Sequence, residues 1–245
     1  HLIFDDYLIL EIRENGLPGI HKINLQDMKA SKVVFNDESY YVSLGYNYDS
    51  KDLNFYYAYS SPTQPLTIYS NNLESGHVSQ LWQKEVINFD SSIYTTSRKF
   101  IRARDGMLIP ITITHRKDID IKDSPILFYG YGSYGLNTES YFRSSVMPLL
   151  NRDFIHVLVN IRGGGEMGKY WYEQGRMFNK LNTFYDFNDA VRAVLDMNIG
   201  NKDKVFAQGG SAGGLLMGAI INMEPELYRG ILSGVPFVDV LTTMS

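Results

Sequence analysis

The sequence predicts an α/β protein whose parallel sheet is preceded by an all-β region. Residues 1–95 show short apolar or alternating runs separated by turn residues, a pattern typical of an all-β sandwich, barrel or propeller. From about residue 98, compact apolar runs alternate with helical stretches and mostly end in Gly-rich turns. This alternation indicates a parallel sheet covered on both faces. We therefore expect two domains, residues 1–95 and 96–245.

The first region contains several candidate strands. They are Tyr7–Ile12, His21–Leu25, Tyr40–Leu44, Phe55–Ser60, Leu66–Tyr69 and Leu81–Ile87. Turn residues such as Asn15-Gly16 separate them. The run Phe55–Tyr59 has high strand propensity, and its aromatic side chains fall on both faces, which favours a strand within stacked sheets. Because no clean repeat is present, sandwich, barrel and propeller stay open on these residues.

The second region contains the elements of an α/β sheet. The candidate strands are Pro125–Tyr129, Phe154–Val159, Lys204–Ala207 and Gly230–Val235, and the candidate helices are Phe142–Asn151, Tyr185–Met197 and Ala212–Met223. Right-handed crossovers leave few topologies for such a chain. We expect the functional site at the carboxyl ends of these strands.

Composition excludes several classes of function. Lys plus Arg number 23 and Asp plus Glu 27, so the net charge is −4, which argues against a nucleic-acid partner. The absence of Cys excludes a disulfide scaffold and a Cys-ligated metal. No apolar run approaches the ~18 residues of a membrane span, so no membrane partner is expected. The chain begins at His1 without a signal-peptide pattern; we expect residues to be missing upstream, and a cytoplasmic location.

The motif that carries chemistry is Gly209-Gly210-Ser211-Ala212-Gly213, which matches the Gly-x-Ser-x-Gly nucleophile elbow. An apolar strand precedes it and an apolar helix follows, as the motif requires. In this sharp turn the residues two before and two after Ser211 crowd each other unless they lack Cβ. We expect the Ser211 hydroxyl to stand above the sheet and the Ala212 N–H to point at a developing oxyanion.

Two alternative interpretations, both of them phosphate-binding loops, fit the sequence less well than a nucleophile elbow. The segment from Gly209 lacks the Lys-Ser/Thr ending of a P-loop and the G-x-G-x-x-G pattern of a dinucleotide site. The run Arg162–Glu166 is Gly-rich, but no long helix follows it directly, so we interpret it as a tight loop that lines the site.

A serine nucleophile needs a base and a group that orients the base. In this fold the order is Ser, then Asp or Glu, then His. No histidine follows Ser211, and His156 lies within an apolar strand, where a core role is expected. Asp239 is the only Asp after Ser211, and we interpret it as a turn or helix-cap carboxylate rather than the acid of a triad.

Several motifs resemble the prolyl oligopeptidase family of serine peptidases, most closely its oligopeptidase B members. They are Ala103-Arg104-Asp105-Gly106, Tyr129-Gly-Tyr-Gly-Ser-Tyr-Gly135, Asn160-Ile-Arg-Gly-Gly-Gly-Glu-Met-Gly168, Asn182-Thr-Phe184-x-Asp186-Phe187, Gly209–Met217 and Val235–Met244. The resemblance covers residues 100–245 and, more loosely, 1–95. It implies an α/β-hydrolase sheet, incomplete in this chain, preceded by the C-terminal blades of a β-propeller. It also implies a triad Asp and His beyond Ser245. We expect no cofactor, because hydrolysis by a serine nucleophile needs none.

The resemblance assigns roles to individual residues. Ser211 matches the nucleophile, the Ala212 N–H one oxyanion donor, and the Tyr131 hydroxyl the other. A phenol donates at neutral pH because its pKa is about 10. Tyr134 and Phe237 match residues that line the substrate pocket, and packing is the alternative for Phe237. Glu139 lies where oligopeptidase B-like chains are acidic and could meet a basic substrate side chain; a solvated surface charge is its alternative.

The sequence therefore predicts a serine peptidase that cleaves short peptides, after Arg or Lys, without a metal. An esterase or acyl-peptide hydrolase on the same scaffold, and a non-catalytic interaction protein built on a degenerate hydrolase, are the alternatives. We expect the 245 residues alone to be inactive and poorly soluble, because the strand Gly230–Val235 leaves an unpaired sheet edge.

Overall fold

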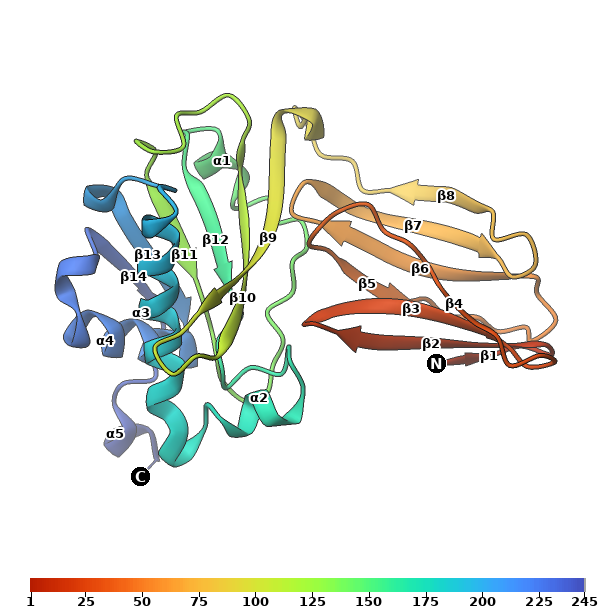
Figure 1. The fold of residues 1–245 in the computed structure, drawn as a ribbon. Helices are drawn as coiled ribbons and strands as arrows, with labels where there is room; N and C mark the ends of the chain where they lie inside the picture. The colour runs from red at the N-terminus through yellow and green to blue at the C-terminus, as the bar shows by residue number, and fades with distance from the viewer. Residues whose placement is uncertain (245) are drawn as a thin grey trace. The chain divides into compact units, whose positions relative to one another are not determined.

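The computed structural model describes residues 1–244, and the chain divides into two compact units. The first, the all-β unit, comprises residues 1–91 and 139–143; the second, the α/β unit, comprises residues 92–138 and those from 144 onward. Figure 1 traces the elements of each. The domain boundary expected after residue 95 stays a prediction, and the compact units divide after residue 91.

The all-β unit contains two four-stranded antiparallel sheets, each in chain order. One holds β1 Leu2–Ile3, β2 Tyr7–Glu14, β3 Leu17–Asn24 and β4 Ala30–Lys32; the other holds β5 Tyr41–Leu44, β6 Asn54–Ser61, β7 Gln64–Asn72 and β8 Val78–Gln83. Every expected strand overlaps one of these, and β1 and β4 are additions. Asn15 and Gly16 join β2 to β3 with φ of 51° and 83°. These angles are those of a type I′ turn, the turn that matches the twist of a hairpin.

The core of the all-β unit is largely aromatic. Phe55, Tyr57 and Tyr59 alternate along β6 and are all buried. The Phe35 ring stacks on Tyr59 with centroids 5.1 Å apart. Because successive residues of a strand point to opposite faces, the half-buried Tyr56 lies on the other side of β6.

Residues 139–143 belong to the all-β unit although the flanking chain belongs to the other. The Phe142 N–H donates to the Ser60 hydroxyl at 2.9 Å, and the Phe142 ring contacts Phe89 edge-on at 4.8 Å. The helix expected over Phe142–Asn151 is therefore wrong in length. Only α1, Met147–Leu150, is helical.

The α/β unit is built on a six-stranded sheet in the order β14-β13-β11-β12-β10-β9. The strands are β9 Tyr94–Arg102, β10 Leu108–Arg116, β11 Ile126–Tyr129, β12 Ile155–Val159, β13 Val205–Gly210 and β14 Gly230–Gly234. The four expected strands run parallel, but β9 and β10 form an antiparallel hairpin, and β10 pairs antiparallel with β12. The four predicted strands are therefore parallel as expected, and the sheet as a whole is mixed because β9 and β10 join it antiparallel. Asp105-Gly106, with Gly106 at φ 88°, supplies the turn that closes this hairpin.

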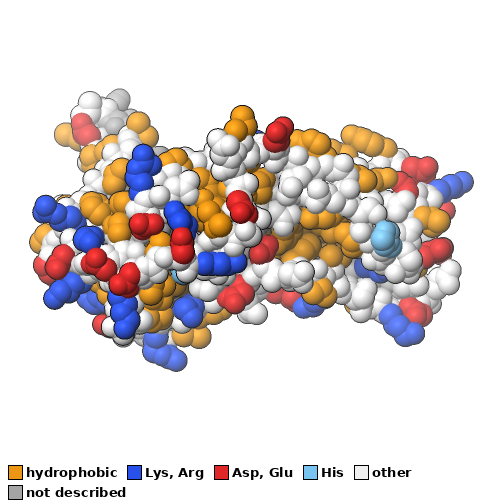
Figure 2. Space-filling view, turned by 90° about the horizontal axis from the view of Figure 1, so that it is seen from above, with side chains coloured by type: hydrophobic (Ala, Val, Ile, Leu, Met, Phe, Trp, Pro, Cys, Tyr) orange, Lys and Arg blue, Asp and Glu red, His pale blue; other side chains and the backbone are white. Residues whose placement is uncertain are grey.

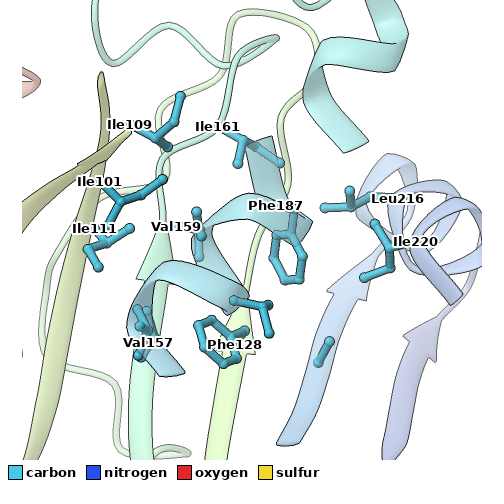
Figure 3. Close-up of a cluster of buried hydrophobic side chains, with 14 of the residues drawn as sticks. Ile101, Ile109, Ile111, Phe128, Val157, Val159, Ile161, Phe187, Leu216 and Ile220 are labelled. Carbon is cyan, nitrogen blue, oxygen red and sulfur yellow. The ribbon is translucent and has the colours of Figure 1, made fainter. Parts of the chain in front are cut away.

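Helices cover this sheet. Besides α1 they are α2 Lys169–Glu173, α3 Lys180–Asp196, α4 Ala212–Met223 and α5 Val240–Met244, with 3-10 turns at Ser91–Ile93, Met177–Asn179, Lys202–Lys204 and Pro225–Leu227. Figure 3 shows Phe187 of α3 with Leu216 and Ile220 of α4 facing aliphatic side chains of the strands. All three are fully buried. This core fixes α4, and with it the turn that precedes α4, against the sheet.

Figure 2 shows Lys and Arg side chains interspersed with Asp and Glu over the surface of the α/β unit. Within residues 1–244, no helix combines the length and apolar character needed to cross a membrane.

Candidate active site

Ser211 occupies the turn between β13 and α4, at φ 58° and ψ −117°. This region of the backbone map is favoured by Gly, and a residue with a Cβ held there stores about 1–3 kcal/mol of strain. Ser211 is exposed and makes no side-chain cap for α4. The strand, strained turn and helix are the arrangement that the nucleophile-elbow motif predicts.

Glycines make this turn possible. A Cβ at Gly209 would lie 2.3 Å from the Gly213 carbonyl oxygen, and one at Gly213 would lie 3.0 Å from the Gly130 carbonyl oxygen. The crowding expected on either side of Ser211 is therefore present. A third requirement was not predicted: a Cβ at Gly214 would lie 2.5 Å from the Pro236 Cα.

The segment after β14 holds the turn from the other side. The Ser211 N–H donates to the Gly234 carbonyl at 2.9 Å, and the Phe237 N–H donates to the Ser211 carbonyl at 3.1 Å. The Phe237 side chain is half-buried. These two backbone bonds keep Ser211 in its strained conformation.

Asp239 caps a helix. Its carboxylate accepts the Thr242 N–H at 3.1 Å in the first turn of α5. Hydrogen bonds from the Thr242 side chain and backbone lower the pKa of Asp239. The helix-cap interpretation is confirmed.

The register of strands β11 and β13 places Tyr131 near Ser211. In the parallel pair of β11 and β13, Tyr129 lies opposite Gln208, so Tyr131 and Ser211 both follow the carboxyl ends of adjacent strands. The Ser211 hydroxyl lies close enough to the Tyr131 phenol to lower the pKa of that phenol. The phenol and the alcohol that sequence analysis singled out, 80 positions apart, therefore meet at one edge of the sheet.

The Tyr131 phenol stays protonated at neutral pH. Burial raises its pKa above the ordinary value, the Tyr134 phenol adds to this effect, and the nearby Ser211 hydroxyl opposes it. A protonated phenol can donate a hydrogen bond to a developing oxyanion.

Ala212 is the first residue of α4 and is buried. Its N–H is one of the N-terminal groups that have no acceptor inside a helix, and the helix dipole places partial positive charge there. The Ala212 N–H and the Tyr131 hydroxyl are thus two donors beside one nucleophilic oxygen.

Tyr134 and Glu139, the other two residues predicted to bind substrate, lie in different surroundings from each other. Tyr134 is 66% exposed and has φ 61°, so its ring stands out from the loop after β11. Glu139 belongs to the all-β unit, where its carboxylate forms a two-pronged ion pair with the Arg13 guanidinium. Its charge is therefore already matched by a cation.

The motif around Arg162 has a structural role that sequence reasoning missed. The Arg162 guanidinium, almost fully buried, donates to Asp186 at 2.8 and 2.5 Å and to Asp105 at 2.6 Å. Burial opposes its charged form, but these hydrogen bonds and charges outweigh it and raise the pKa of Arg162. Arg162 of the Gly-rich loop thereby joins the two motifs that contain Asp105 and Asp186. The signal available in the sequence was Asp186 between the aromatic residues Tyr185 and Phe187, where a charge is unexpected without a partner.

Among residues 1–244, no group of three or more His, Asp or Glu side chains is placed to hold a metal ion.

Comparison with known proteins places this site in a family. Residues 140–245 match the model of the prolyl oligopeptidase family, and residues 2–84 match that of the prolyl oligopeptidase N-terminal β-propeller domain. The chain belongs to the prolyl oligopeptidase family. The two antiparallel sheets are therefore blades of a propeller, and the mixed sheet is that of an α/β-hydrolase domain, as expected.

Individual known proteins match almost the whole chain. Dipeptidyl aminopeptidase BI of Pseudoxanthomonas mexicana is 42% identical over 99% of the chain and 34% of its own length. Protease 2 of Moraxella lacunata is 37% identical over 98% of the chain and 35% of its own length. Oligopeptidase B from Trypanosoma brucei superposes with a TM-score of 0.89 and 32% identity, over 99% of this chain and 36% of that one. The chain spans about a third of the length of the curated relatives it matches.

Proposed function

We propose that the protein is a serine peptidase that cleaves short peptides through an acyl-enzyme on Ser211. The observation that carries this proposal is the Ser211 hydroxyl, presented on a strained turn beside the Tyr131 phenol. A structural relative, oligopeptidase B from Trypanosoma brucei, was solved with covalently bound antipain, which supports covalent chemistry in this fold.

In the first step, the Ser211 oxygen bonds to the substrate carbonyl carbon while its proton passes to a general base. The carbonyl oxygen becomes an oxyanion that accepts hydrogen bonds from the Ala212 N–H and the Tyr131 hydroxyl. The C–N bond then breaks, and the leaving amine takes the proton from the base. Water next attacks the ester on Ser211 by the same route. We propose that the base is a histidine, oriented by an aspartate, from a part of the protein outside these 245 residues.

The proposed specificity is cleavage after Arg or Lys, supported by the likeness to oligopeptidase B. Tyr134 and Phe237 are proposed to line the substrate pocket. Glu139 is proposed to attract a basic side chain, and a substrate cation would then have to replace or join Arg13.

The relative with 42% identity favours a second candidate, removal of dipeptides from a free amino terminus, since it is named a dipeptidyl aminopeptidase. Fluorogenic peptides with Arg, Lys, Pro or Leu before the reporter, each with a free or a blocked amino terminus, separate the two. Faster cleavage of blocked Arg and Lys peptides supports the first candidate. Cleavage that requires a free amino terminus two residues from the reporter supports the second.

The mechanism is tested in the full-length protein with a fluorophosphonate probe and two variants. We expect the probe to label Ser211 alone, Ser211→Ala to abolish hydrolysis, and Tyr131→Phe to lower kcat about 10²–10³-fold with little change in KM. Labelling elsewhere, or full activity of Ser211→Ala, would refute the proposal. Hydrolysis of simple esters but not of peptide amides would indicate the esterase, and no hydrolysis or labelling would indicate the interaction protein.

A further inference from the structure

A half-buried lysine reaches into the loop that carries Tyr131. Lys180 is the first residue of α3, and its ammonium donates to the Gly132 carbonyl at 2.7 Å and to the Ser133 hydroxyl at 2.8 Å. These two acceptors directly follow Tyr131 in the chain. The catalytic scheme above does not use Lys180.

The backbone that Lys180 holds fits tightly into its surroundings. Gly132 has φ 66°, and a Cβ there would lie 2.6 Å from carbon atoms of both Ile161 and Thr183. A Cβ at Gly163 would lie 2.2 Å from the Gly132 carbonyl oxygen. The loop is thus packed against a strand end and a helix, and the remaining side of its carbonyl faces the Lys180 ammonium.

The charge on Lys180 is held without an acidic partner. Among the described residues, no carboxylate forms an ion pair with its ammonium, and burial lowers its pKa to about 8. Besides its two hydrogen bonds, the ammonium faces the Phe184 ring one turn along α3, whose centroid is 5.8 Å from the nitrogen. Burying an ammonium in this way opposes folding. If this position only filled space, an apolar side chain of similar length would stabilise the fold more than Lys180 does.

We propose that Lys180 is a positioning residue for the oxyanion site: by holding Gly132 and Ser133, it keeps the Tyr131 hydroxyl directed at Ser211. This inference rests on the proposed function, because it assumes that the Tyr131 hydroxyl stabilises the transition state. A displacement of about 1 Å in such a group can cost up to about 10²-fold in rate.

A double-mutant cycle in the full-length protein tests this inference. Lys180→Met keeps the length and removes the donor. We expect it to lower kcat about 10- to 100-fold with KM nearly unchanged, and to have less than about a twofold effect when it is combined with Tyr131→Phe. Lys202→Met is the matched control, because Lys202 is exposed in the 3-10 turn before β13, at the opposite end of that strand from Ser211. It should leave kcat at the wild-type value.

The readouts separate a positioning role from a structural one. Fluorophosphonate labelling counts the folded sites, so kcat is expressed per labelled site. If Lys180→Met gives no labelled protein, Lys180→Gln, which retains an uncharged donor, replaces it in the same cycle. An unchanged kcat, a change confined to KM, or the same loss in the Tyr131→Phe variant as in the wild type overturns the inference. A normal kcat in Tyr131→Phe instead overturns the oxyanion role in the proposed function.

Discussion

The two units differ in which kinds of residue adopt the left-handed backbone conformation, at the hairpin of β2 and β3 in the all-β unit and at the sheet edge of the α/β unit. In the hairpin of β2 and β3 it falls on Asn15 and Gly16, which tolerate it. After the strands β11, β13 and β14 it falls on Tyr134, Ser211 and Val235, which do not favour it. The hairpin turn is encoded by its own residues alone, whereas the strained residues at the sheet edge are also held by tertiary contacts, such as the bond from the Ser211 N–H to the Gly234 carbonyl. Strain concentrated at one edge of a sheet is a mark of a functional site.

The cores of the two units also differ in what holds them together. The core of the all-β unit is held by aromatic contacts, among them Tyr57 with Tyr69 at 5.5 Å. The α/β unit buries the ion pairs of Arg162 within an otherwise aliphatic core. Replacing one ring of an aromatic cluster lowers stability by a small amount, whereas removing the partner of a buried charge lowers it strongly. The two units should therefore respond differently to conservative substitutions.

The largest expected effect comes from removing both the strain and the nucleophile with Ser211→Gly. Activity should fall at least about 10⁵-fold, while the free energy of unfolding should rise by about 1 kcal/mol, because Gly adopts φ 58° without strain. Peptidase assays and chemical denaturation measure the two quantities. Asn15→Gly is the control and should change neither by much. A less stable Ser211→Gly protein would mean that the turn is not strained.

Asp186→Asn should give the largest loss of stability. It leaves the buried Arg162 guanidinium with only Asp105 as an anionic partner, and we expect the free energy of unfolding to fall by about 3–5 kcal/mol. Asp118→Asn, which breaks an exposed pair with Arg116, should have no measurable effect. Equal losses in the two variants would contradict the contrast drawn between buried and exposed pairs.

Lys180 makes stability depend on pH in an unusual direction. Its pKa in the folded protein is about 8, below the ordinary 10.5, so the unfolded chain binds more protons between these values. Stability should therefore rise as the pH increases from about 8 toward 10.5, by at most about 3 kcal/mol. Denaturation of wild type and Lys180→Met over this range isolates the effect, because other groups titrate in both. A wild-type curve parallel to that of the variant would show that the lysine titrates normally.

The smallest effect is expected in the aromatic core. Phe35 contacts the rings of Tyr40, Tyr59 and Tyr57, with centroids 4.8, 5.1 and 5.9 Å away. Phe35→Leu should lower the free energy of unfolding by about 1–2 kcal/mol and leave kcat unchanged. Phe154→Leu, which loses the contact with a single ring, should cost less. A loss as large as that of Asp186→Asn would remove the distinction between the two cores.

Elements with a strong local signal were predicted well. Helix Ala212–Met223 has the bounds expected from its apolar run, and every expected strand is present. The strands β9 and β10 were not predicted: the apolar and polar residues of β9 follow no simple period, and the alternation of Ile and Thr in β10 was missed. The helix expected from Phe142 does not form there, because the Phe142 N–H bonds to the Ser60 hydroxyl and the Phe142 ring contacts Phe89 in the all-β unit.

The sequence by itself determined the nucleophile turn, because Gly209, Ser211 and Gly213 are neighbours in the chain and a Cβ at Gly209 would meet the Gly213 carbonyl. Only the tertiary structure decided what surrounds it. The approach of Tyr131 depends on the register of two parallel strands, the need for glycine at position 214 depends on Pro236, and the anchoring of the loop depends on Lys180. These contacts join residues that are far apart in the chain, and short-range patterns in a sequence carry no information about which distant segments will pack together.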